Sequence, residues 1–163
     1  MTSLKGVRFR NRNIWVYDAS VSVLLAQVIR AVEDMPAARR PVWWLNIVQD
    51  MRSAAALTYF GIDLDLGLDD IQREEFAELV DDAGAVLLRR GTFTADEAAA
   101  WKVLDDMSVT FRGTEPADLA PAAEVGTALT ALIRGTLPPA PEGTWWFYGP
   151  PGGRTTIRMA EGG

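Results

Sequence analysis

The chain has 163 residues, 48% of them hydrophobic, and a formal net charge of −6 at pH 7. This length is typical of one domain, and the hydrophobic content is sufficient for a buried core, so we expect a single globular domain over residues 1–163. The sequence contains no cysteine and no histidine, which excludes Cys/His zinc sites, Ser-His-Asp triads and histidine general bases. The chemistry that remains uses carboxylates, Lys, Tyr, Ser or Thr, so the composition argues against an enzyme.

The sequence also predicts where the protein is located. No apolar run reaches the roughly 18 residues that a transmembrane helix needs. The first 13 residues lack the apolar centre of a signal peptide. The absence of cysteine is compatible with a reducing compartment. We therefore expect a cytoplasmic protein that has no membrane partner.

Charge is distributed unevenly along the chain. Residues 1–17 carry four basic and no acidic side chains, and residues 144–163 carry two basic and one acidic side chain. Since those ends hold +4 and +1, the middle of the chain carries −11. An acidic surface attracts basic partners, so this distribution favours a basic protein as the partner.

The first predicted element is a β-hairpin in the segment 7-VRFRNRNIWVYD-18. Apolar and polar residues alternate on both sides of an Asn-rich turn, and Asn11-Arg12 is the expected two-residue loop. This loop pairs Arg8 with Trp15. Because side chains alternate across a strand, one face is expected to hold Val7, Phe9, Ile14 and Val16, and the other Arg8, Arg10, Trp15 and Tyr17.

Apolar residues at helical spacing predict five helices along the middle of the chain. The first is expected to have Asp18 or Ser20 as its N-cap. The second opens near Pro41 and ends at Gly61, although residues 42–48 are also good strand formers. Thr94 and Glu97 form a capping box for the fourth helix. The ranges are 19–35, from about 44 to 60, 70–90, 94–106 and 122–134, with a short strand at 108–112.

A second hairpin is predicted at the end of the chain. Residues 135–143 are a Pro-rich extended connector that leads into it. The strands 144–148 and 154–159 flank a Gly/Pro-rich turn, which places Trp146 opposite Thr156 and Tyr148 opposite Arg154. One face is expected to carry Trp145, Phe147, Thr155, Ile157 and Met159, and the other Trp146, Tyr148, Arg154, Thr156 and Arg158.

These elements predict an α+β fold, in which about five helices pack on a small antiparallel sheet formed by the N-terminal and C-terminal hairpins. The free face of that sheet is expected to combine aromatic rings with arginines, the residue types enriched at binding hot spots. An alternative is that these arginines only stack on the rings across the strands and stabilise the sheet. The candidate binding face consists of Arg8, Arg10, Trp15, Tyr17, Trp146, Tyr148, Arg154 and Arg158.

The acidic stretch 63-DLDLGLDDIQREE-75 resembles a calcium loop only in part. Counted from Asp63, acids occupy positions 1, 3, 7 and 12 of such a loop. However, Gly67 and Ile71 occupy positions that need an oxygen ligand, and Leu68 occupies the position that needs glycine. We therefore predict no metal here, and instead a leader segment in which Asp69 caps the next helix with Gln72 as its partner. The expected acidic surface consists of Asp63, Asp65, Asp69, Asp70, Glu74, Glu75 and Glu78.

Three functional hypotheses follow from this sequence. The first is a small acidic module of the immunity or inhibitor type that binds another protein. Immunity proteins neutralise toxins such as nucleases, and the analogy with them rests only on size and charge. The second is a nucleic-acid or phosphate-ligand module that uses the basic aromatic sheet face, although the acidic body repels polyanions. The third is an enzyme that uses carboxylate chemistry. None of them calls for a cofactor.

Overall fold

The computed structural model describes residues 3–58 and 61–158, and within them the chain forms five α-helices and nine strands. The α+β class predicted from the sequence is confirmed. Met159, expected to close the last strand, and residues 59–60, expected to end the second helix, lie outside the described residues. The elements are β1 Leu4–Phe9, β2 Arg12–Tyr17, α1 Asp18–Glu33, the 3-10 turn Ala37–Arg39, α2 Trp44–Ala56, β3 Ile62–Asp63, α3 Asp70–Arg90, β4 Thr92–Phe93, α4 Ala95–Ala100, β5 Lys102–Leu104, β6 Met107–Ser108, β7 Ala117–Asp118, α5 Ala120–Arg134, β8 Thr144–Tyr148 and β9 Thr155–Arg158.

The main sheet joins both ends of the chain in the strand order β3-β1-β2-β8-β9. β1 pairs antiparallel with β2, and β8 pairs antiparallel with β9, so both predicted hairpins are confirmed. However, β2 pairs parallel with β8, and β1 pairs parallel with β3. The expected purely antiparallel sheet is therefore wrong, because the helices between β2 and β8 form a long connection that returns the chain in the same direction.

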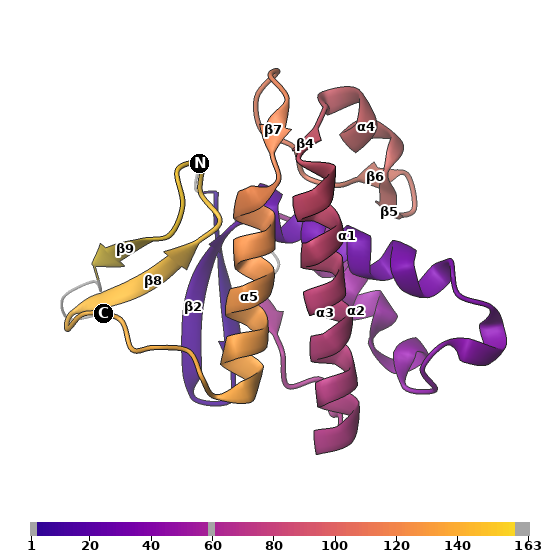
Figure 1. Ribbon diagram of the computed structural model, residues 1–163, viewed down its shortest axis with the longest axis horizontal. Coiled ribbons are helices and arrows are strands. Elements are labelled where there is room, and N and C mark those ends of the chain that lie inside the picture. Colours follow the sequence, from indigo (N-terminus) through magenta and orange to yellow (C-terminus); the bar gives the residue numbers. More distant parts are fainter. Residues whose placement is uncertain (1–2, 59–60, 159–163) are drawn as a thin grey trace.

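The helices gather on one side of this sheet (Figure 1). α1 lies at the centre of the helical layer and packs against α2, α3 and α5, and eleven of its sixteen residues are buried. α3 and α5 form a closely packed pair, in which Gly84 faces the backbone of Ala123. None of the helices in the described part of the chain combines the length and apolar character needed to cross a bilayer.

The N-terminal hairpin has a different register from the predicted one. Its turn is Arg10-Asn11, with Arg10 at φ 57°, so Phe9 pairs with Arg12, and Trp15 pairs with Gly6 rather than with Arg8. The expected pairing is displaced by two residues. Because a shift of two residues leaves every side chain on its own face, the alternation that identified the core side did not determine the register.

The predicted helices are largely confirmed, with differences at their ends. α3 spans residues 70–90 as expected, and Thr94 and Glu97 form the expected capping box at α4. Residues 44–56 are helix and not strand, but Pro41 lies outside the helix, which ends at Ala56. α4 ends at Ala100 because the chain turns there into β5 and β6. No side chain caps the N-terminus of α1. Asp18, one of the two expected caps, is instead the first residue of the helix, and its buried side chain makes a different contact.

Candidate functional site

The join between the two hairpins separates the predicted binding face into two surfaces. In the parallel pairing of β2 with β8, Trp15 lies beside Phe147 and Val16 beside Tyr148. Residues in register on adjacent strands point to the same side of a sheet. Val16 is a core residue, and Tyr148 beside it is only 5% exposed. The prediction that Trp15, Tyr17, Trp146 and Tyr148 share one free face is therefore wrong.

Trp146, Tyr148 and Arg154 form a cluster on the helix side of the sheet. The two rings lie 6.1 Å apart between centroids, and the Arg154 guanidinium lies 4.1 Å from the centroid of Trp146. The indole Nε1 of Trp146 donates a hydrogen bond to the carbonyl of Pro138, 2.7 Å away. The stacking of Arg154 on Trp146 is the contact that the structural alternative expected, and the indole hydrogen bond also attaches the Pro-rich connector to the hairpin. Arg158, the remaining member of the C-terminal set, is exposed on the edge strand β9.

The opposite surface, here called the outer sheet face, is apolar and aromatic. Gly6, Trp15 and Phe147 lie in register across three strands, Tyr17 lies beside Leu4, and Trp145 beside Ile157. Among the described residues, no helix packs on this side, and the side chains of the outer sheet face do not contact the core. All of them are half-buried. The outer sheet face consists of Leu4, Gly6, Trp15, Tyr17, Trp145, Phe147 and Ile157.

The N-terminal arginines do not form a free cationic surface beside these rings. Arg8 lies at the rim of the outer sheet face, where its Nη2 contacts the Asp63 carboxylate at 2.8 Å. Hydrogen bonding from Arg8 holds the pKa of the Asp63 carboxyl below its usual value. Arg10 lies in the turn, with its guanidinium 5.0 Å from the ring centroid of Phe9. The basic aromatic face expected from the sequence is thus replaced by an apolar face with an ion pair at its edge.

The acidic stretch is a helix leader, as predicted. Asp69 accepts a hydrogen bond from the backbone N–H of Gln72, and the Gln72 side chain accepts one from the backbone N–H of Asp69. Leu64 and Leu68 point into the core. Within residues 3–58 and 61–158, no three acidic side chains gather in a way that could hold a metal ion.

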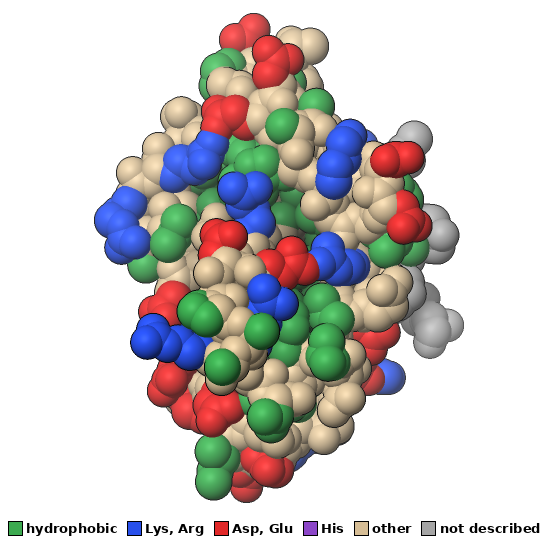
Figure 2. Space-filling view, turned by 90° about the vertical axis from the view of Figure 1, so that its right-hand side faces the viewer, with side chains coloured by type: hydrophobic (Ala, Val, Ile, Leu, Met, Phe, Trp, Pro, Cys, Tyr) green, Lys and Arg blue, Asp and Glu red, His purple; other side chains and the backbone are tan. Residues whose placement is uncertain are grey.

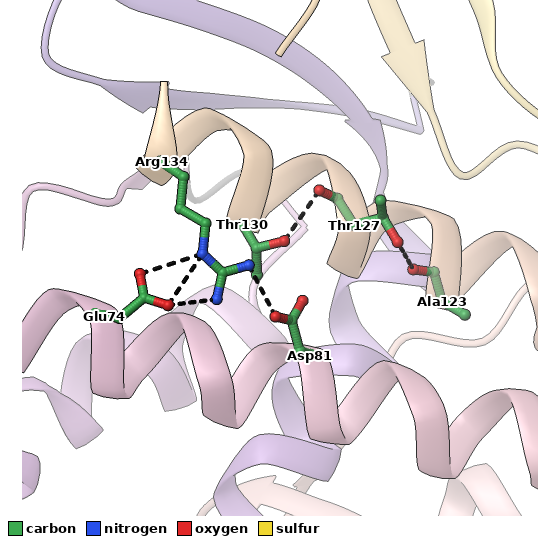
Figure 3. A network of polar contacts seen from close by, with 6 residues as sticks. All are labelled: Glu74, Asp81, Ala123, Thr127, Thr130 and Arg134. Atoms are coloured by element: carbon green, nitrogen blue, oxygen red, sulfur yellow. Dashed lines mark hydrogen bonds and ion pairs between the residues drawn. The ribbon is translucent and has the colours of Figure 1, made fainter. Parts of the chain in front are cut away.

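Several of the predicted surface acids have partners within the chain. Arg134 of α5 contacts both Glu74 and Asp81 of α3, at 2.7 Å and 2.9 Å (Figure 3). This hydrogen bonding lowers the pKa of the Glu74 carboxyl and raises that of the Arg134 guanidinium. Glu75 accepts a hydrogen bond from the Trp43 indole. Asp70 pairs with Arg73, whereas Asp65 and Glu78 are simply exposed.

The side of the molecule opposite the β8–β9 hairpin therefore has a mixed surface. Figure 2 shows acidic and basic side chains interspersed on this side, with apolar side chains between them. Salt bridges between exposed side chains contribute at most about 1 kcal/mol each, so this pattern stabilises the helices only modestly. A broad single-sign surface does not appear on the side in view.

Three charged groups that the sequence did not identify as site residues lie at the junction of β1, α1 and the segment after β6. Asp18 is only 1% exposed, and Arg112 contacts it through Nε and Nη2. This pairing raises the pKa of the Arg112 guanidinium. Lys5 is 2% exposed, and its Nζ donates to the carbonyl of Ala54. The strand alternation was a usable signal, because Lys5 precedes Val7 and Phe9 on the inward face.

The buried position of Lys5 predicts an unusual pH dependence. Burial lowers the pKa of its ammonium from 10.5 to about 8, and the charge of Asp18 opposes part of the shift. Since the folded-state pKa is the lower one, the unfolded chain binds more protons between pH 8 and pH 10.5. The free energy of unfolding should therefore rise with pH across this window, by about 3 kcal/mol at most.

Urea unfolding at several pH values measures this effect, with Lys5→Met as the reference chain. Subtracting the two stability curves removes the titration of every other group. We expect the wild-type protein to gain stability relative to Lys5→Met as the pH rises. If the difference in unfolding free energy between the wild-type protein and Lys5→Met stayed constant from pH 8 to pH 10.5, the account would be contradicted.

A cavity of about 550 Å³ lies next to this charged junction. Its walls come from the start of α1, the start of α5, the segment 110–119 and the turn between β8 and β9. Phe93, Phe111 and Val23 supply apolar surface, and Arg112 supplies a charged group. The sequence did not indicate this cavity, because its lining comes from helix ends and loops that are far apart in the chain and carry no common motif.

The described residues form an α+β protein with an aromatic sheet face that none of their helices covers and with a sizeable cavity near the charged junction. No protein-family model matches the chain, and no match was found among the curated proteins or the solved structures.

Proposed function

We propose that this chain is a cytoplasmic protein-binding module that contacts its partner through the outer sheet face. One observation carries the proposal: the aromatic rings of Trp15, Trp145 and Phe147 lie together on a sheet face that no described helix covers. Aromatic residues are enriched in the centres of protein interfaces, where their burial provides much of the binding energy. The net charge of −6 favours a basic protein as the partner.

An inhibitor or immunity role is one form of this function. Such a protein acts by occupying its partner and needs no catalytic group of its own. The lack of histidine and cysteine agrees with that requirement. The rim pair of Arg8 and Asp63 would add orientation to an otherwise apolar contact.

The structure gives less support to a nucleic-acid ligand. Single-stranded nucleic acid binds to surfaces that combine a basic groove with stacking rings. Here Arg154 stacks on Trp146 and Tyr148 on the helix side, and Arg8 is paired with Asp63. The rings of the outer sheet face therefore lack the free cations that this function would require.

Partner capture with matched variants tests the proposal. The tagged protein is incubated with lysate of its source organism, and co-purifying proteins are quantified by mass spectrometry. We expect Trp15→Ala to reduce recovery of a stoichiometric partner at least tenfold, since a hot-spot truncation costs about 2 kcal/mol or more. Recovery should be lower in high salt if the partner is basic.

Leu45→Ala is the control, because Leu45 is 83% exposed but lies at the start of α2, away from the sheet. The amount of partner recovered with Leu45→Ala should equal the amount recovered with the wild-type protein. Melting curves of both variants establish that each is folded. Equal recovery with folded Trp15→Ala would reject the outer sheet face as the binding surface.

A further inference from the structure

We propose that the cavity beside Arg112 is a small-molecule site for an uncharged, largely apolar compound with one carbonyl oxygen. This function differs from protein binding at the outer sheet face, and the two sites share only Tyr17. The volume of about 550 Å³ falls within the range of small-molecule sites, which is roughly 300–1,000 Å³. Such sites are mostly apolar and contain a few polar groups that orient the ligand.

The walls of the cavity suit an apolar ring system. Phe93 is 2% exposed, and it contacts Trp101 edge-to-face at 4.9 Å between centroids, which holds its ring in position. Val23 and Leu119 are also almost fully buried, and Phe111 is half-buried. A ligand ring inserted here would exclude water from the exposed part of the Phe111 ring and contact the buried side chains behind it.

The wall formed by the β8–β9 turn is fixed rather than loose. The hydroxyl of Ser20 donates a hydrogen bond to the carbonyl of Gly149 at 2.6 Å. Gly149 lies so close to α1 and α5 that an added Cβ would come within 2.6 Å of Val125. The cavity is therefore built by a turn that is attached to two helices, and a preformed wall lowers the entropic cost of binding.

Arg112 is the group that selects the ligand's polar atom. Its Nε and one Nη2 hydrogen are used by Asp18, whereas Nη1 has no hydrogen-bond partner among the described residues. The side chain is 34% exposed and lines the cavity. Arginine is only a donor, so it requires an acceptor oxygen from the ligand.

The charges around the cavity favour an uncharged acceptor over an anion. Asp18 already balances the charge of Arg112. Glu115 and Asp118 also line the cavity and are exposed, so they add negative charge at its opening. Two carboxylates at the entrance would oppose a carboxylate or phosphate ligand. A ketone or amide carbonyl accepts the Arg112 hydrogen bond without that repulsion.

Three naphthalene probes with the same ring system test both the site and its charge preference. They are 2-acetylnaphthalene, 2-naphthoate and 2-naphthylmethylammonium, which carry a neutral carbonyl, an anion and a cation. Titrations followed by NMR of the backbone amides report both the affinity and the location. We expect 2-acetylnaphthalene to bind with a Kd at or below about 1 mM and to shift the amides of Ala19, Thr110 and Phe111.

Two variants separate the cavity from other apolar surfaces. Ala19→Phe places a ring in the cavity from its α1 wall and should abolish binding, whereas Ala99→Phe, on the exposed side of α4, should leave it unchanged. Arg112→Lys keeps a positive charge beside Asp18, but its single amine replaces the three nitrogens of the guanidinium. No nitrogen is then left over for the ligand, so the affinity for the ketone should fall about tenfold. The fold of each variant is checked by its melting curve.

Each outcome decides the proposal. Ketone binding that is stronger than naphthoate binding and is lost in Ala19→Phe supports it. Tighter binding of either 2-naphthoate or 2-naphthylmethylammonium than of 2-acetylnaphthalene would overturn the uncharged ligand class. Absence of saturable binding by all three probes, or binding that survives in folded Ala19→Phe, would overturn the site itself.

Discussion

Replacing Arg112 with alanine is expected to destabilise the protein by about 2–3 kcal/mol, because it leaves the buried carboxylate of Asp18 without its charged partner. Asp18 is only 1% exposed, whereas Arg112 is 34% exposed, so water that enters the space left by the guanidinium would replace its hydrogen bonds only in part. The same arginine connects the segment after β6 to the start of α1, so its loss also releases a wall of the cavity. Lys5, which is buried nearby, would compensate for only part of the lost charge.

Urea unfolding at pH 7 measures this loss, and Arg134→Ala provides the control. Arg134 also pairs with two carboxylates, but Glu74 and Asp81 are 49% and 44% exposed. Exposed pairs are screened by water, so the control should lose no more than about 1 kcal/mol. Equal losses in the two variants would show that the burial of Asp18 does not determine the strength of its pairing.

Gly149→Ala is expected to reduce the stability by about 3 kcal/mol, combining backbone strain with a steric clash. Gly149 has φ 91°, a conformation that residues with a Cβ rarely adopt. An added Cβ would lie 2.6 Å from Cγ2 of Val125 and 2.9 Å from Cβ of Ser20. Both neighbours belong to helices that pack in the core, so neither can move without disturbing that packing.

Gly152→Ala isolates the steric part of this effect. Gly152 has φ 92°, and no other group lies within 4 Å of the position of its added Cβ. The two substitutions therefore introduce similar backbone strain, and their difference reports the contact of the turn with α1 and α5. We expect Gly149→Ala to be the less stable variant by about 1–3 kcal/mol in thermal or urea unfolding. Similar stabilities would indicate that the turn is not attached to the helices as described.

The elements that the sequence predicted correctly are those determined by local interactions. α3 begins where its capping residues predicted, because the side chains of Asp69 and Gln72 each accept a hydrogen bond from the other's backbone N–H within one turn. The capping box of Thr94 and Glu97 is equally local. The alternation of Val7 and Phe9 identified the buried side of the first hairpin, since the period of a strand is independent of its partner.

The features that the sequence did not predict depend on contacts between distant segments. The parallel pairing of Val16 with Tyr148 determines which face of the second hairpin turns toward the helices. Both faces of that hairpin contain aromatic residues, so its own pattern did not identify the buried one. As a consequence, the sequence pattern favours Trp146 and Tyr148 for the free face of the sheet, whereas Trp145 and Phe147 lie on the outer sheet face. The pairing of Asp18 with Arg112 spans 94 residues and has no local signal.

The outer sheet face is the central claim, and photocrosslinking at adjacent residues tests it most directly. A benzoylphenylalanine is placed at position 147 in one chain and at position 146 in another, since Phe147 and Trp146 are neighbours that point to opposite sides of the sheet. The probe at 147 should crosslink to the captured partner, and the probe at 146 should crosslink within the chain, to the connector near Pro138. A partner crosslink at 146 and none at 147 would contradict the account.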